Sequence, residues 1–176
     1  MDEAAYFDFV KSGCADEESF LQEYMCQPAD DDAAFLEYDL IASAEYPAGT
    51  DWTQSQGGTL FAGVDIGRKH DLTVLWVVEL LGDVPYTRHI EARKNMTKGD
   101  QEKVLWPWFE TIKASGGRIC IDATGLGIGW TDDAQARFGK YSVEGVTFTA
   151  RVKEQLAYPL RGKMEDRQLR IPHDKH

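Results

Sequence analysis

Residues 59–94, TLFAGVDIGRKHDLTVLWVVELLGDVPYTRHIEARK, decide the fold. This stretch contains an apolar run that ends at Asp65, a polar turn at 67–71, a second apolar run at 72–81 and an alternating third run after the turn at 82–83. Apolar and β-branched runs separated by turns rich in Gly and Asp predict strands joined by hairpins. We therefore expect a three-stranded antiparallel meander.

Downstream of the meander, helical and strand patterns alternate. Apolar residues at helical spacing predict a helix over 98–114, although Pro107 lies within it. The later predicted elements are a strand at 118–122, a helix at 126–137, a strand at 142–149 and a helix from about 151. The order βββαβαβα indicates an α/β protein with a mixed sheet covered by helices. It matches the ribonuclease H-like fold, in which the first and fourth strands are neighbours.

Two aspartates stand at the ends of predicted strands. Asp65 closes the first strand and Asp122 the fourth, and a glycine follows each within three residues. Aspartate is depleted in strands and costly to desolvate without a partner. On neighbouring strands the two carboxylates would meet at one end of the sheet, where oxygen ligands suit a hard divalent cation. The alternative roles are a turn residue for Asp65 and a helix N-cap for Asp122.

Charge is distributed unevenly along the chain. The net charge is −11, yet residues 1–50 carry 13 acidic side chains against Lys11 alone, and the remainder is nearly neutral. Basic residues gather in the last 26 positions, namely Arg151, Lys153, Arg161, Lys163, Arg167, Arg170 and Lys175. This strip is compatible with a phosphate backbone passing one face of the protein, or with a solvated helix face.

The N-terminal part has a different organisation from the rest. Short helices are predicted at 16–25 and 33–45, and the segment 46–58 is rich in Gly, Pro, Ser and Thr, which is typical of a linker. We expect an acidic helical linker segment at 1–58 and a ribonuclease H-like domain at 59–176.

Several protein classes are disfavoured. No apolar run approaches the roughly 20 residues that span a bilayer, and the acidic start MDEAAYFDF is unlike a signal peptide. Three cysteines without CxxC spacing favour a reduced cytoplasmic protein. The four histidines show no zinc-ligand spacing, and the string GLGIG lacks the context of a dinucleotide-binding loop.

Two motifs together resemble a known family. GVDIGRKHDLTVLWV (63–77) followed by IDATGLGIGW (121–130) resembles the nuclease domain of the large terminase subunit of tailed phages, especially Mu-like phages and prophages. The upstream segment 16–41 resembles the connection between terminase motor and nuclease. The resemblance implies a metal-dependent endonuclease that cuts concatemeric double-stranded DNA in the host cytoplasm. In the parent protein it implies an ATPase motor domain, the portal and the small terminase subunit as partners.

The resemblance also implies residue roles. Asp65 corresponds to the first metal carboxylate of the family, Asp122 to the second, and Asp71 to an acid that supports the site. The chemistry implied is phosphodiester hydrolysis with two Mg²⁺ or Mn²⁺ ions about 4 Å apart. The family has a third carboxylate further on, for which the candidates without a motif are Glu165, Asp166 and Asp174.

Other residues near the motifs are candidates for contact with DNA. Glycines would let the backbone stay low beside the site, and these are Gly67, Gly125, Gly127 and Gly129. Basic candidates for phosphate contact are Arg68, Lys69, His70, Arg151, Lys153, Arg161 and Lys163. The alternative for residues 68–70 is an exposed polar turn. The aromatic residues Trp106, Trp108 and Phe109 are predicted to belong to the core.

Two departures from the family pattern shape our expectation. No Walker A motif occurs, so this chain lacks the packaging ATPase. Since no third acid has a matching motif, we expect a fragment of a longer subunit whose nuclease domain is truncated at its C-terminus.

Two other function classes stay open. DIGRKHDLTVL (65–75) also resembles the phosphate-binding hairpin of actin-like ATPases and sugar kinases, but those proteins need a duplicated core and a second phosphate loop. A nuclease-like fold could also serve as a non-catalytic module that binds DNA, portal or another packaging subunit.

Overall fold

The structure, a computed structural model, describes residues 34–67 and 71–173. Contacts divide the chain into two units, Met1–Ile41 and Ala42–His176. Helix α3 (Tyr38–Ala44) lies within the predicted helical segment 33–45. The helix predicted at 16–25 falls outside the described residues. None of the helices in the described ranges is long and apolar enough to cross a membrane.

A five-stranded mixed sheet forms the centre of the second unit. Its strands are β1 (Thr59–Asp65), β2 (Thr73–Leu81), β3 (Val84–Arg93), β4 (Ile119–Asp122) and β5 (Val143–Val146). The spatial order is β3-β2-β1-β4-β5, with β1, β2 and β3 antiparallel and β4 parallel to both β1 and β5. The predicted ribonuclease H-like arrangement is confirmed, including the neighbouring first and fourth strands.

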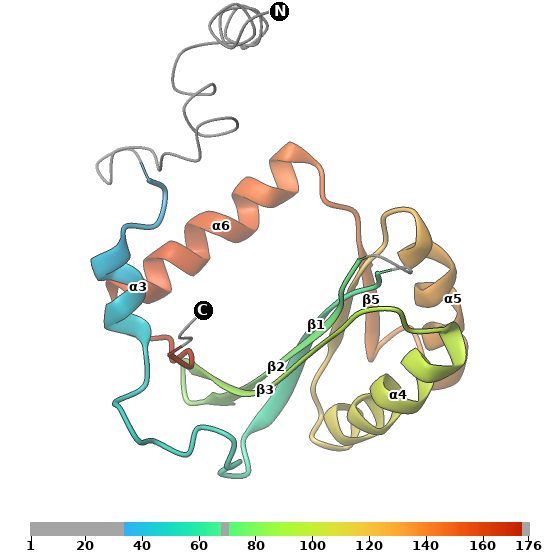
Figure 1. Cartoon of the computed structure of the whole chain (residues 1–176), viewed down its shortest axis with the longest axis horizontal. Coiled ribbons are helices and arrows are strands. Elements are labelled where there is room, and N and C mark those ends of the chain that lie inside the picture. The colour runs from blue at the N-terminus through green and yellow to red at the C-terminus, as the bar shows by residue number, and fades with distance from the viewer. Residues whose placement is uncertain (1–33, 68–70, 174–176) are drawn as a thin grey trace, which may run out of the picture. The chain divides into compact units, whose positions relative to one another are not determined.

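Helices lie on both faces of this sheet. Figure 1 shows α4 (Lys98–Ala114) and α5 (Leu126–Phe138) on one face and α6 (Ala150–Glu165) along the other. Threonine hydroxyls cap α4 and α6 by accepting hydrogen bonds from backbone N–H groups. Both helices continue through an internal proline, so the kink expected in the last helix does not end it.

The core lies between the sheet and the α4–α5 layer. Alternate residues of the strands point into it, among them Leu75, Val77, Ile119 and Ile121, all fully buried. Phe109 is buried in the same cluster, and Trp106 and Trp108 pack against it. The prediction that these three aromatic residues belong to the core is confirmed. By contrast, α6 buries only Met164, so the opposite face of the sheet is less densely covered.

The Gly/Ser-rich segment before β1 is bound to the sheet by a buried carboxylate. Glu79 of β2 is fully buried and accepts hydrogen bonds from the backbone N–H groups of Gln56 and Gly58 and from the Ser55 hydroxyl. It also forms a 2.6 Å ion pair with Arg88 of β3. Residues 55–58 are therefore part of the folded domain rather than a free linker.

The last described residues cover part of the sheet edge. Arg170 forms an isolated parallel bridge with Tyr86 of the edge strand β3, and Ile171 forms another with Glu45. Backbone hydrogen bonds of 2.9–3.0 Å secure both sides, including Thr87 N–H to the carbonyl of Arg170. His173 adds a 2.8 Å contact with the carboxylate of Glu45. The C-terminal residues thus join two segments that are far apart in sequence.

Candidate active site

Asp65 and Asp122 end adjacent parallel strands. The β1–β4 ladder pairs Gly63 with Cys120 and Val64 with Ile121, and one further step brings Asp65 beside Asp122. Because side chains alternate along a strand, both carboxylates point away from the α4–α5 core, toward the α6 side of the sheet. The structure thus brings together the two residues that the sequence motifs single out.

Both carboxylates line a hollow of about 310 Å³. Its other walls come from β1, β2 and the segment between β5 and α6, and they consist of Gly63, Val64, Val74, Trp76 and Phe148. Apart from the two acids these walls carry no charge. Sequence reasoning missed Trp76 and Phe148, because the predicted fifth strand ran to residue 149, whereas β5 ends at Val146 and the chain then turns toward the site.

The electrostatics of the site favour a bound cation. Burial raises the pKa of Asp65, and the negative charges of Asp122 and then Asp71 raise it further, against a hydrogen bond from the Ile66 backbone N–H that lowers it. Asp65 therefore carries its charge among like charges, an arrangement that a divalent cation would relieve. One oxygen of Asp122 accepts a 2.9 Å hydrogen bond from the Thr124 backbone N–H. The N-cap position of α5 belongs to Gly125, not to Asp122.

Asp71 lies beside the site but lines a different cavity. It borders a cleft of about 870 Å³ at the N-terminal end of α4, together with Gly67 and Gln101. The amide of Gln101 is buried there and donates to the Gly67 carbonyl at 2.9 Å and to the Thr73 hydroxyl at 2.7 Å. These bonds fix the residues that follow Asp65. Arg68, Lys69 and His70 lie outside the described residues.

Gly127 has a structural reason distinct from access for DNA. A Cβ atom at this position would lie 1.6 Å from the backbone oxygen of Asp122, so α5 could not pack where it does. Gly125, just before the helix, has φ +58°, a conformation that favours glycine. Both glycines therefore serve the turn that carries Asp122 into α5.

Gly127→Ala is expected to destabilise the protein at the upper end of about 1–3 kcal/mol, because the methyl group must push α5 away from β4. Gly129→Ala, two residues along the same helix, is the matched control: its Cβ would meet nothing within 4 Å, and alanine favours helix. Urea unfolding of both variants measures the difference. Equal stability of the two would show that α5 does not contact the Asp122 backbone as described.

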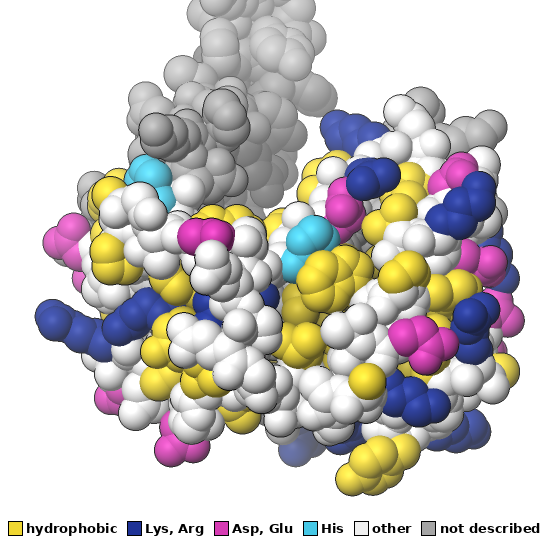
Figure 2. Space-filling view, turned by 90° about the horizontal axis from the view of Figure 1, so that it is seen from below, with side chains coloured by type: hydrophobic (Ala, Val, Ile, Leu, Met, Phe, Trp, Pro, Cys, Tyr) yellow, Lys and Arg dark blue, Asp and Glu magenta, His cyan; other side chains and the backbone are white. Residues whose placement is uncertain are grey.

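The basic candidates on α6 separate into two groups. Arg151 and Lys153 stand in the first turn of the helix, next to the segment that bears Phe148, and both are exposed. Lys163, near the other end, donates to the backbone carbonyl of Asp83 in the β2–β3 turn. Arg161 pairs with Glu165 at 2.8 Å. On the face seen in Figure 2, basic and acidic side chains are interspersed.

Candidates for a third metal carboxylate lie away from the hollow. Glu165 is the last residue of α6, roughly 20 Å along the helix from its start, and Asp166 follows it. Their neighbour Lys163 contacts the β2–β3 turn, which is at the opposite end of β2 from Val74, the partner of Asp65. Asp174 lies outside the described residues. Within the described ranges, no three acidic, histidine or cysteine side chains form a group able to hold a metal ion.

Residues 62–176 match the family model described as the terminase RNaseH-like domain. The chain belongs to this terminase family. The match includes both strand-end aspartates and every element from β2 to α6. It therefore favours the terminase resemblance over the likeness of residues 65–75 to actin-like ATPases and sugar kinases.

Solved structures give the same assignment for the terminase domain. The large terminase nuclease of the thermophilic phage G20c, solved with bound zinc, shares 25% identity at a TM-score of 0.53, covering 66% of this chain and 64% of that one. The same phage nuclease with bound magnesium matches at 23% identity and a TM-score of 0.56, over 70% and 62%. The large terminase of another thermophilic bacteriophage, in complex with ATP-γ-S, matches at 12% and 0.56, over 77% and 33%. The last two likenesses concern the fold alone.

The terminase domain spans less than two thirds of each of these relatives. Comparison of the sequence with curated proteins gives no match.

Proposed function

We propose that this chain is the metal-dependent endonuclease domain of a phage terminase large subunit, which cuts concatemeric double-stranded DNA by phosphodiester hydrolysis. The observation that carries the proposal is the pair Asp65 and Asp122, placed side by side at the ends of β1 and β4 and open to a hollow. The family and the metal-bound phage nucleases support it.

The residues present fit a hard divalent cation. Asp65 and Asp122 offer carboxylate oxygens without nitrogen or sulfur ligands nearby, and mutual repulsion raises the pKa of Asp65. Mg²⁺ is commonly held by one or two carboxylates, with water and substrate phosphates completing its shell. Bound Mg²⁺ or Mn²⁺ would supply activation of water and charge stabilisation at the phosphate, in the proposed arrangement from two ions.

The remaining residues position the DNA. Gly63 leaves the floor of the hollow without a side chain, which gives a strand room to approach the carboxylates. Arg151 and Lys153 are exposed close to the hollow, where they can contact backbone phosphates without reading bases. Asp71 adds negative potential next to Asp65. Arg161 and Lys163 lie further along α6 and already have partners within the protein.

We further propose the division into an acidic linker at 1–58 and a nuclease domain at 59–176, with the boundary tied to Glu79 as described above. In the parent subunit the linker would connect to an ATPase motor, and the partners would be the portal and the small terminase subunit. The site of action would be the host cytoplasm.

The test combines metal binding and cleavage. Calorimetric titration with Mn²⁺ should give saturable binding to the wild type that is lost in Asp65→Asn and in Asp122→Asn, with both variants folded by circular dichroism. Supercoiled plasmid incubated with Mn²⁺ should be nicked and linearised, and EDTA should stop the reaction. Metal binding that survives both substitutions would refute the shared carboxylate site.

One alternative function has an observation in its favour. Among the residues that the structure describes, no third ligand side chain joins Asp65 and Asp122. A module that binds DNA or a packaging protein without cutting would show DNA binding in EDTA and no nicking at any Mn²⁺ concentration.

A further inference from the structure

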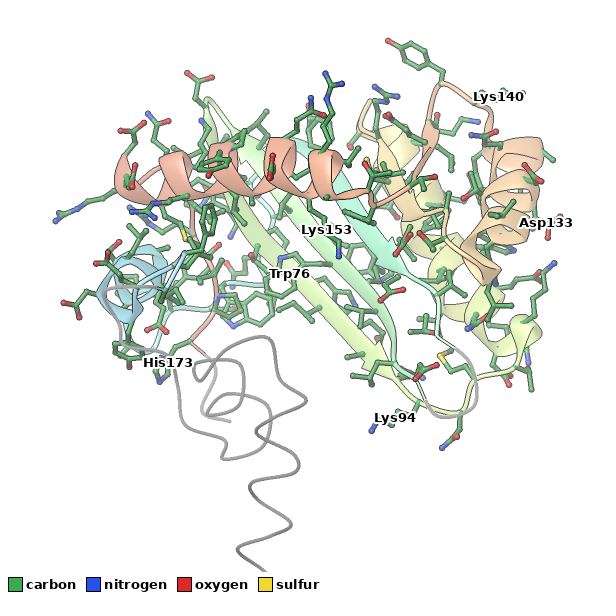
Figure 3. All side chains as sticks on the ribbon, turned by 90° about the horizontal axis from the view of Figure 1, so that it is seen from above. Trp76, Lys94, Asp133, Lys140, Lys153 and His173 are labelled. Carbon is green, nitrogen blue, oxygen red and sulfur yellow. The ribbon has the colours of Figure 1, made fainter. Side chains whose placement is uncertain are left out.

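Two aromatic side chains stand beside the paired carboxylates. Trp76 and Phe148 line the same hollow as Asp65 and Asp122, and they are 39% and 41% exposed. Of the five tryptophans in the chain, Trp76 alone falls among the exposed large hydrophobic residues of the described ranges. Figure 3 shows it on the sheet at the level of α6, in the same region as Lys153. An exposed tryptophan within a charged hollow calls for a ligand that matches both chemistries.

The indole is held in a fixed position. Its Nε1–H donates a 3.1 Å hydrogen bond to the hydroxyl of Thr87, which is fully buried on the neighbouring strand. On its other side Trp76 pairs with Gly63 of β1, where a Cβ atom would meet nothing within 4 Å. The polar edge of the ring is therefore occupied, while an apolar surface faces open space above Gly63.

The distance from this surface to the carboxylates suits a nucleic acid strand. Gly63 precedes Asp65 by two residues, and Trp76 lies one strand away, so the indole stands roughly 8 Å from Asp65 by the usual strand rise and spacing. A phosphate held near Asp65 and Asp122 would carry an adjoining sugar and base into this part of the hollow.

We propose that Trp76 stacks on a nucleobase of the strand being cut, with Phe148 closing the other side of the hollow; this rests on the proposed nuclease function. A base inside a duplex is already stacked on both faces, so the base that meets Trp76 must leave the stack. The substrate class is DNA with an unpaired or easily unpaired nucleotide next to the scissile phosphate. Stacking reads no base edge, so the preference is for structure and not for sequence.

An apolar protein segment fits the hollow less well. It would bury Asp65 and Asp122 without neutralising them, which is strongly unfavourable. A nucleotide brings an apolar base face for Trp76 and a phosphate that shares a cation with the carboxylates. The one ligand therefore satisfies both parts of the wall.

Fluorescence of 2-aminopurine in a DNA strand tests the stacking in EDTA, independently of cleavage. The wild type should quench the probe in single-stranded DNA more than in a duplex. Trp76→Ala should abolish the quenching and weaken single-strand binding about tenfold, within the range for loss of one base–aromatic stack, whereas Trp76→Phe should stay within about threefold of wild type. Tyr141→Ala, which removes an 88% exposed aromatic residue outside the hollow, is the matched control and should change nothing.

Gly63→Val provides a second variant that leaves Trp76 in place. Valine suits a strand, and the space above Gly63 is open, so the fold should persist while the hollow is filled and quenching is lost. Unchanged quenching in Trp76→Ala and Gly63→Val, or none in the wild type, overturns the stacking proposal. A wild type that cleaves in Mn²⁺ while Trp76→Ala keeps its KM and its strand preference also overturns it, with the nuclease function intact. Quenching that depends on Trp76 in a protein that never cleaves upholds stacking and refutes the nuclease function.

Discussion

Asp65→Asn is expected to lower the rate of DNA cleavage by about 1000-fold or more, and Asp122→Asn by a similar factor. Both substitutions keep the shape of the side chain and remove a charged oxygen ligand from the paired site at the ends of β1 and β4. Metal stabilisation of a phosphoryl transition state contributes several kcal/mol, and about 4 kcal/mol corresponds to 1000-fold. Single-turnover nicking of supercoiled plasmid in Mn²⁺ measures the loss.

Asp132→Asn is the matched control, because Asp132 is an exposed acid on α5 that lines neither the hollow nor the cleft. Its cleavage rate should equal that of the wild type. Thermal melting without metal separates lost chemistry from lost fold. Since burial, Asp122 and Asp71 raise the pKa of Asp65, its charged form is disfavoured in the folded state, and Asp65→Asn should melt at the same temperature or higher. Retention of cleavage within tenfold would remove Asp65 from the metal site.

The largest expected effect on stability is that of Glu79→Ala, about 3–5 kcal/mol. The substitution leaves Arg88 buried without its charged partner and strips hydrogen-bond acceptors from residues 55–58. Glu91→Ala is the control on the adjacent strand: its ion pair with Arg93 is partly exposed, and it should cost no more than about 1 kcal/mol. Urea unfolding at neutral pH compares the two. A loss in Glu79→Ala as small as that in Glu91→Ala would show that the network contributes little.

The same network predicts acid sensitivity. Burial alone would raise the pKa of Glu79, but hydrogen bonds from Ser55, Gly58, Arg88 and Gln56 lower it to about 2 from the ordinary value of 4.5. A lowered pKa stabilises the folded state fully above pH 4.5, and this stabilisation, roughly 3 kcal/mol, is lost as pH falls toward 2. Glu79→Ala should flatten that part of the stability profile.

The sequence predicted the sheet and the carboxylate pair because both depend on local pattern. Alternation and glycine turns define the strands, and a strand that ends in aspartate marks its own position. The neighbouring placement of Asp65 and Asp122 required the fold, since the β1–β4 pairing joins residues more than 50 positions apart.

Other features depend on contacts that no local pattern reveals. Glu79 looks like one acid in an apolar strand, and its partners come from residues 55–58 and from Arg88. The Gly/Ser content of 46–58 indicated a linker, whereas backbone N–H groups of that segment bind the buried carboxylate. Phe148 reaches the hollow because β5 stops at Val146, a limit set by its pairing with Asp122. Composition around 142–149 gave no signal for that end.

The bridge between Arg170 and Tyr86 also bears on self-association. An edge strand presents unpaired N–H and C=O groups that can template pairing with another molecule, and β3 is the long edge of this sheet. Residues 170–171 occupy part of that edge with their own backbone hydrogen bonds. At the other edge β5 is only four residues long, too short to recruit a foreign strand firmly. The chain thus guards its two edges by different means, one by a cover and the other by brevity, and so resists sheet-to-sheet aggregation.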